Sequence, residues 1–218
     1  MKNTPKIERR YYTFDIDVRK ADNGQKYLTG RPIVYDSITD LGYYYEIIDR
    51  GALDGANLRD VPFLVNHNDK MIPCARSRRN NPNSTMQMSA DAGGLFLNRI
   101  ALDVENNYTS RALYSAVKRG DIDGMSFAFS IDGEKWENLE SDHPTRHITS
   151  IGAVYEVSAV TFPAYASTEI NARSKDALDS ARSALEKARQ QRAAAVDTVA
   201  NELALAKARF NFNFKFGG

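Results

Sequence analysis

Apolar and polar residues alternate along much of the first 170 residues, which is the pattern of strands with one buried face. The clearest case is residues 11–19, where Tyr12, Phe14, Ile16 and Val18 fall on one face. Further strands are predicted over residues 26–36, 43–49 and 61–67, a hairpin over 84–102 with DAGG as its turn, and β-like stretches at GMSFAFSI and HITSIGAVYEVSAVTF. The pattern predicts a β-rich domain.

One helix is predicted within this region, over residues 106–120. An asparagine can cap its start, apolar residues recur on one face, and Lys118, Arg119 and Gly120 form a typical helix end. A short helix is also predicted over residues 50–60, although two glycines in that segment disfavour it.

From residue 173 the pattern becomes helical. Residues 173–210 contain no proline or glycine, and apolar residues recur at three- and four-residue steps that only Arg192 interrupts. The chain ends in FNFNFKFGG, where four phenylalanines alternate with polar residues as in an amphipathic strand. We therefore predict two parts, a folded domain over residues 1–172 and an amphipathic helical tail over residues 173–218.

The tail has two interpretations. It holds nine Lys and Arg residues against five Asp and Glu residues, so it is basic although the whole chain carries a net charge of only +1. A helix of this kind packs on its own domain or pairs with a copy of itself, or it docks with a different helical partner. The sequence leaves both interpretations open, and the terminal Phe repeat has no assigned role.

Composition excludes several classes of protein. The nearly neutral net charge gives no global sign of binding to nucleic acid or to a membrane surface. No window approaches eighteen consecutive apolar residues, and the first twenty residues have no signal-peptide pattern, so we expect a cytosolic soluble protein. The single cysteine, Cys74, excludes an internal disulfide and a zinc site built from several cysteines. No cofactor is expected.

Three residues carry the candidate chemistry. Ser126 lies in the apolar run GMSFAFS and is either an ordinary strand serine or a nucleophile. His67 follows the apolar run VPFLV and is either a histidine in a surface turn or a general base held at a strand exit. Glu156 lies in a nearly apolar run, where a carboxylate needs a partner: an arginine in a structural ion pair, or a histidine that it orients.

Two other sites are weaker candidates. A zinc site could be drawn from His67, Asp69, His143 and His147. That set lacks any recognised ligand spacing, and Pro144 disfavours a helical pair of histidines. Cys74 lies seven residues after His67, so a Cys–His nucleophile pair is conceivable, but a lone cysteine among apolar residues is more typical of a core.

Several phrases together carry more information than any one alone. In order, they are GRPIVYDS, EIIDRGAL, VPFLVNHND, GGLFLNRIAL, GMSFAFS, a single tryptophan and YEVSAVTFPAYASTEI. This series closely resembles the prohead proteases of tailed bacteriophages, the capsid maturation proteases that are related in fold to the herpesvirus assemblins. The resemblance covers residues 10–172 and is strongest in the last two phrases.

The resemblance implies an α+β, β-dominated fold, namely an assemblin-like β-barrel with flanking helices. It implies a serine endopeptidase in which Ser126 is the nucleophile and His67 the general base. Assemblins use a second histidine as third member, and the natural counterpart here is Glu156, which would orient His67. Two positions depart from the family pattern: Asn68 stands where Asp is common, and Ala128 where Gly is common.

The resemblance also implies partners and a location. Such proteases act inside the prohead in the host cytoplasm, where they cut the scaffold and the N-terminal segment of the major capsid protein, and commonly themselves. The tail would then be an address for that compartment and a segment removed by autocleavage. No nucleic acid, membrane or metal partner is expected, and self-association is left open. The alternatives are a non-enzymatic capsid-assembly or scaffold protein that uses the same tail and, third, a metal-dependent hydrolase.

Overall fold

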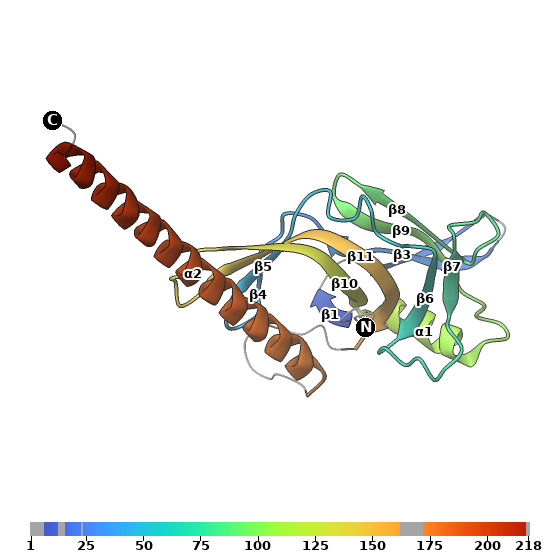
Figure 1. Ribbon diagram of the computed structural model, residues 1–218. Coiled ribbons are helices and arrows are strands. Elements are labelled where there is room, and N and C mark those ends of the chain that lie inside the picture. The colour runs from blue at the N-terminus through green and yellow to red at the C-terminus, as the bar shows by residue number, and fades with distance from the viewer. Residues whose placement is uncertain (1–6, 13–15, 23, 162–171, 217–218) are drawn as a thin grey trace.

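The computed structural model of the chain describes residues 7–12, 16–22, 24–161 and 172–216. The strands are β1 (Ile7–Tyr12), β2 (Ile16–Lys20), β3 (Lys26–Val34), β4 (Thr39–Asp40), β5 (Tyr45–Ile48), β6 (Asp60–Val65), β7 (Ala75–Arg78), β8 (Met86–Asp91), β9 (Gly94–Ala101), β10 (Gly124–Glu137) and β11 (Thr145–Val160). The helices are α1 (Tyr108–Arg119) and α2 (Ala172–Phe216). Figure 1 shows the strands gathered in one body from which α2 extends.

The strands form two sheets around one core. The larger sheet has the order β1-β10-β11-β5-β4, with β6 joined to β11 and β7 to β6, and the smaller has the order β2-β3-β9-β8. The long antiparallel strands β10 and β11 form the centre of the larger sheet (Figure 1). Fully buried side chains from both sheets meet in the core, among them Leu28, Leu95 and Leu97 from the smaller sheet and Met125, Phe127 and Phe129 from β10.

The predicted barrel is not closed in the part of the chain that the structure describes. A barrel needs every strand to be paired on both sides. Here β1 and β4 end the main path of the larger sheet, and β2 and β8 end the smaller one. The β-dominated fold with two helices is confirmed, but its architecture is two open sheets.

Most predicted elements are present. The strands predicted over residues 26–36, 43–49 and 61–67 and the hairpin over 84–102 correspond to β3, β5, β6 and β8–β9. The alternating run over 11–19 is divided between β1 and β2, and residues 13–15 lie outside the described chain. The helix predicted over 50–60 is wrong, because a series of turns replaces it and Gly51 has a left-handed φ of 85°.

Helix α1 begins and ends where its sequence predicts. The side chain of Asn107 accepts a hydrogen bond from the backbone N–H of Ser110, which caps the start. Gly120 has a φ of 77° at the other end, and its N–H donates to the last carbonyls. Leu113 and Val117 are buried on the face that meets the core. The helix therefore covers one end of the sheets.

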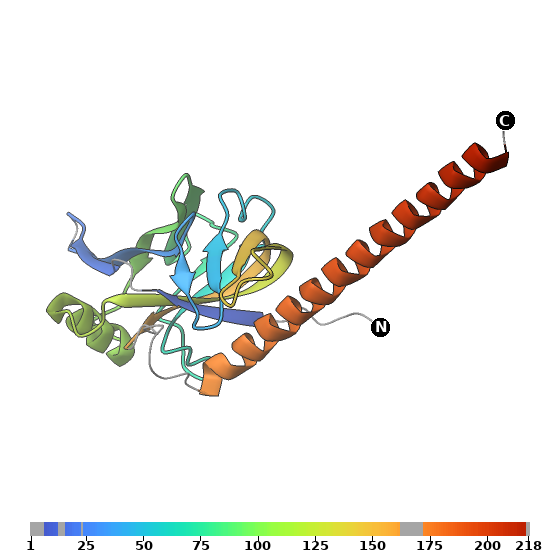
Figure 2. The same ribbon diagram turned by 90° about the vertical axis from the view of Figure 1, so that its left-hand side faces the viewer.

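The first part of α2 packs on the domain, as one interpretation expected. Leu185 is buried, and Arg189 Nε donates to the carbonyl of Leu139 at 2.9 Å. Arg192 lies 3.5 Å from the Glu140 carboxylate. These contacts join α2 to the turn between β10 and β11. Beyond Arg192 the side chains of residues 193–207 are exposed, and Figure 2 shows the helix projecting away from the sheets.

The strand expected in FNFNFKFGG is wrong, because α2 continues through Phe216. Extending an existing helix adds one hydrogen bond for each residue fixed, whereas a new strand needs a partner. No helix in the described residues is both long enough and apolar enough to cross a membrane.

Candidate active site

Strand β11 brings together two segments that are far apart in the sequence. Ser158 on β11 pairs with Ser126 on antiparallel β10, and with Leu64 on parallel β6 on its other side. Paired residues in an antiparallel ladder point to the same face, and so do residues two apart on one strand. Ser126, Ser158 and Glu156 therefore lie on one face of the larger sheet.

His67 is placed over this face by a tight turn after β6. Asn66 N donates to the Ala159 carbonyl at 2.9 Å, which holds the turn against β11. Asn66 and His67 both have a left-handed φ, 51° and 57° respectively. That conformation is uncommon for residues other than glycine, and such backbone conformations cluster at functional sites.

His67 and Glu156 form a buried pair. His67 Nδ1 lies 2.5 Å from Glu156 Oε1, and the two side chains are only 6% and 9% exposed. A carboxylate at Nδ1 favours the tautomer that carries its proton there, which leaves the basic lone pair on Nε2. The prediction that Glu156 needs a partner is confirmed, and the main partner is a histidine. Arg9 Nε lies further from the same oxygen, at 3.9 Å.

Ser158 holds this pair and was missed by the sequence analysis. Its hydroxyl donates to Glu156 Oε2 at 2.6 Å and accepts from the backbone N–H of His67 at 3.2 Å. It is fully buried. Strand alternation places Ser158 on the face of Glu156, but only the non-local pairing of β6 with β11 shows that it also contacts His67.

Ser126 is fully buried, and its hydroxyl is engaged by β1. Its Oγ donates to the backbone carbonyl of Arg10 at 2.7 Å. Tyr11 on β1 is its partner in the ladder. The structure therefore brings His67 and Glu156 into contact and places Ser126 on the same face, opposite Ser158 in the ladder. The hydroxyl proton of Ser126 points toward β1.

A groove of about 710 Å³ adjoins His67. Its lining includes Arg9, Asn66, Asn68, Asp69, Cys74 and Thr109. Asp69, one place after the expected acid position, donates its backbone N–H to the His67 carbonyl at 3.0 Å. Cys74 is mostly buried, and burial raises the pKa of its thiol. It packs in the core as expected.

The candidate zinc set is not assembled. His143 Nε2 lies 3.1 Å from Asp40 Oδ1, and His147 Nδ1 lies 2.6 Å from Asp49 Oδ1. These two histidines thus pair with separate carboxylates. Among the described residues there is no group of three or more His, Cys, Asp or Glu side chains placed to hold a metal ion.

Comparison with known proteins decides the family. A family model described as caudovirus prohead serine protease matches residues 14–182. The chain belongs to this family. It is therefore a prohead serine protease, a hydrolase with a role in phage capsid maturation. No curated protein and no solved structure gave a significant match.

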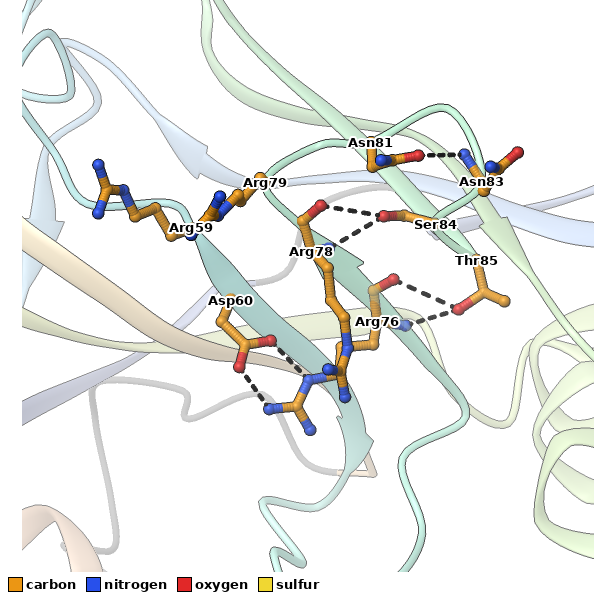
Figure 3. A pocket seen from close by; sticks show the side chains of 9 residues that line it. All are labelled: Arg59, Asp60, Arg76, Arg78, Arg79, Asn81, Asn83, Ser84 and Thr85. Atoms are coloured by element: carbon orange, nitrogen blue, oxygen red, sulfur yellow. Dashed lines mark hydrogen bonds and ion pairs between the residues drawn. The ribbon is translucent and has the colours of Figure 1, made fainter.

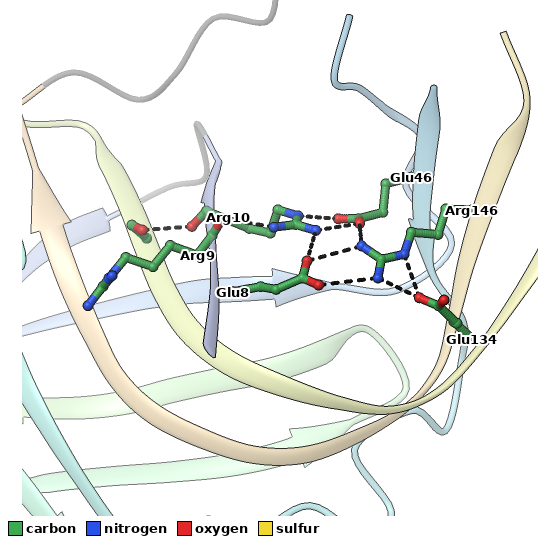
Figure 4. Close-up of polar contacts among 7 residues, drawn as sticks. Glu8, Arg9, Arg10, Glu46, Glu134 and Arg146 are labelled. Carbon is green, nitrogen blue, oxygen red and sulfur yellow. Dashed lines mark hydrogen bonds and ion pairs between the residues drawn. The ribbon is translucent and has the colours of Figure 1, made fainter. Parts of the chain in front are cut away.

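The other face of β1 in this protease carries a buried ion network (Figure 4). Arg10 binds both carboxylate oxygens of Glu46, with Nη2–Oε2 at 2.6 Å, and also binds Glu8 at 2.5 Å. Arg146 Nη1 lies 3.0 Å from Glu8 Oε2, and Arg146 also contacts Glu46 and Glu134. The network joins β1 to β5, β10 and β11. Because isolated buried charges are costly, each member depends on the others.

Acid is expected to weaken this network through Glu8. Burial raises the pKa of Glu8, but Arg10 and Arg146 outweigh it, and the pKa lies below its ordinary value of 4.5. The resulting stabilisation is therefore present above about pH 4.5 and is lost as the pH falls through the lowered pKa. Urea unfolding between pH 7 and pH 3 should show a steeper loss of stability for the wild type than for Glu8→Gln. Equal slopes would contradict this role.

A second pocket, of about 720 Å³, gathers positive charge (Figure 3). Its lining contains Arg59, Arg76, Arg78 and Arg79 against one acid, Asp60. Arg76 is neutralised by Asp60, with two contacts at 2.6 and 2.8 Å. The pocket lies at the start of β6, whereas His67 follows the end of that strand. It is therefore separate from the candidate active site.

Proposed function

We propose that the protein is a serine endopeptidase in which Ser126 is the nucleophile, His67 the general base and Glu156 the group that orients His67. The observation that carries this proposal is the buried contact between His67 and Glu156 on the sheet face that Ser126 shares. A histidine held by a carboxylate at Nδ1 is suited to accept a proton at Nε2. Family membership supplies the reaction class.

In this mechanism, His67 Nε2 removes the Ser126 proton as Oγ attacks the carbonyl carbon of a peptide bond. The tetrahedral intermediate collapses when His67 returns that proton to the leaving amine, which breaks the C–N bond and leaves an acyl-enzyme. Water, activated by His67, then hydrolyses the ester. Glu156 stabilises the imidazolium formed in each half, and Ser158 keeps the carboxylate turned toward His67.

The substrates follow from the proposed role inside the prohead. We infer that the enzyme cuts the scaffold and the N-terminal segment of the major capsid protein, and that it also removes its own tail. The exposed part of α2, residues 193–207, supports action on the scaffold and removal of the tail, because exposed chain is accessible to a helical scaffold partner and to cleavage. The proposed relationship to the assemblins rests on the sequence phrases alone.

The competing function is a non-enzymatic capsid-assembly protein. The hydrogen bond from Ser126 to the Arg10 carbonyl favours it, since an ordinary strand serine would be satisfied in this way. The two functions differ in what they require of His67. A scaffold has no use for a buried His–Glu pair held in a left-handed turn, whereas a protease does.

Covalent labelling tests the proposed function. The full-length protein is incubated with its major capsid protein, and in parallel with a fluorophosphonate that esterifies activated serines. We expect new capsid-protein termini in the first reaction, and one adduct on the peptide containing Ser126 in the second. An adduct on another serine, or capsid cleavage that persists after Ser126 is fully modified, would contradict the assignment.

A further inference from the structure

Strand β1 makes two contacts with the candidate site, one with Ser126 and one with Glu156. The Arg10 carbonyl accepts the Ser126 hydroxyl at 2.7 Å, and Arg9 Nε lies 3.9 Å from Glu156 Oε1. Arg9 is also part of the lining of the groove beside His67. With β1 in this position the Ser126 side chain is fully buried, so the carbonyl carbon of a separate peptide has no access to Oγ.

The position of β1 in the sheet makes it the element that can leave. Within the described residues, β1 is the last strand of the larger sheet and pairs only with β10. The other neighbour of Ser126 is β11, which pairs with β10, β5 and β6 and so cannot move without loss of the whole sheet. Removing β1 would expose the edge of β10 from Met125 to Ser130.

That edge suits an extended peptide. A strand edge offers backbone N–H and C=O groups to any chain that runs alongside it, and peptide recognition by strand addition uses them. Strand β1 already satisfies these groups over six residue pairs, from Ile7–Ser130 to Tyr12–Met125. A substrate strand would need the same groups, so β1 and the substrate compete for them.

We propose that β1 is an occluding strand, which fills the position beside Ser126 that an extended substrate peptide takes and must leave β10 before Ser126 reacts. The inference rests on the proposed function. The ion network on the other face determines how readily β1 leaves: Glu8 and Arg10 alternate with Arg9 along the strand and bind Glu46 and Arg146. The occluded state is thus held by charges that take no part in the chemistry.

A reversible cross-link tests the proposal on the full chain. Ile7 and Ser130 are direct ladder partners, and antiparallel partners have Cα atoms about 4.5–5.5 Å apart, within the range of a disulfide. Ile7→Cys combined with Ser130→Cys therefore allows a disulfide that ties the N-terminal end of β1 to β10. The next strand along the chain, β2, belongs to the other sheet. The matched controls are the two single variants, which keep the native buried Cys74.

Two readouts are measured on the oxidised and the reduced double variant. The first is the rate of fluorophosphonate labelling at Ser126, and the second is hydrogen exchange of residues 124–130, which reports release of β1 without any chemistry. We expect labelling of the oxidised form to fall at least about tenfold, and dithiothreitol to restore the rate of the single variants. We also expect exchange in this segment to slow on oxidation.

Equal labelling rates in the oxidised and reduced forms would overturn the occluding role, and so would equal exchange. If neither form is labelled but exchange still slows on oxidation, release of β1 is supported and the assignment of Ser126 as nucleophile fails instead. Glu46→Gln provides the opposite change, because it weakens the hold on Arg10 from the far side of the strand. We expect it to speed labelling and exchange together; faster labelling without faster exchange would count against the proposal.

Discussion

Replacing Ser126 by alanine is expected to lower the rate of capsid-protein cleavage by about a millionfold. The reason is that the proposed mechanism forms the acyl-enzyme on Ser126 Oγ, so without this oxygen His67 and Glu156 have no nucleophile to assist. The fold should persist, because the change removes one hydrogen bond to the Arg10 carbonyl, worth about 1 kcal/mol. Initial cleavage rates and urea unfolding measure the two effects.

Ser130→Ala is the matched control for that variant. Ser130 lies on the same strand, is also nearly fully buried and pairs with Ile7 as Ser126 pairs with Tyr11. It should keep wild-type cleavage. If Ser126→Ala still cleaved the capsid protein at a rate within tenfold of this control, another residue would have to be the nucleophile.

Replacing Glu156 by glutamine is expected to lower the cleavage rate by about ten-thousandfold, with little change in shape. Ser158 Oγ donates to one oxygen of Glu156, so the amide oxygen of glutamine would remain on that side. Its NH₂ group would then face His67 Nδ1, which becomes an acceptor and moves the imidazole proton to Nε2. In that tautomer, His67 cannot take the Ser126 proton. Single-turnover cleavage across pH measures the loss.

Two further variants test the tautomer argument. Glu137→Gln, an exposed acid on the same hairpin, should leave the rate unchanged. Adding Ser158→Ala to Glu156→Gln removes the group that fixes the amide, so its oxygen can turn toward His67 and part of the activity should return. A double variant slower than Glu156→Gln alone would mean that Ser158 does not set the orientation of the side chain at position 156.

The sequence predicts local structure well and the site only in part. Alternation identifies β3, β5, β6 and the β8–β9 hairpin, because one face of each meets the core. The site depends on the parallel pairing of β6 with β11, which joins residues about ninety positions apart. Pattern alone could not supply that contact, so Ser126, His67 and Glu156 came together only through resemblance to a family.

The burial of charged residues on β1 had no signal in the sequence. Its first residues, IERR, are mostly charged, and charged residues are rarely buried unless they are paired. Glu8 and Arg10 are buried because Glu46 and Arg146, far along the chain, complete the network. The strand predicted for residues 210–216 is wrong for a different reason. A period-two pattern forms a strand only where a neighbouring strand exists to pair with it.

The burial of Ser126 has a kinetic consequence. If only molecules with β1 released can react, the measured rate constant is the intrinsic one multiplied by the fraction of released molecules. A released fraction of about one in a hundred would make a fully competent nucleophile look about a hundredfold slower. A low turnover in the purified protein would therefore reflect the small fraction of molecules with β1 released. The intrinsic rate constant of Ser126 would be the measured rate constant divided by that fraction.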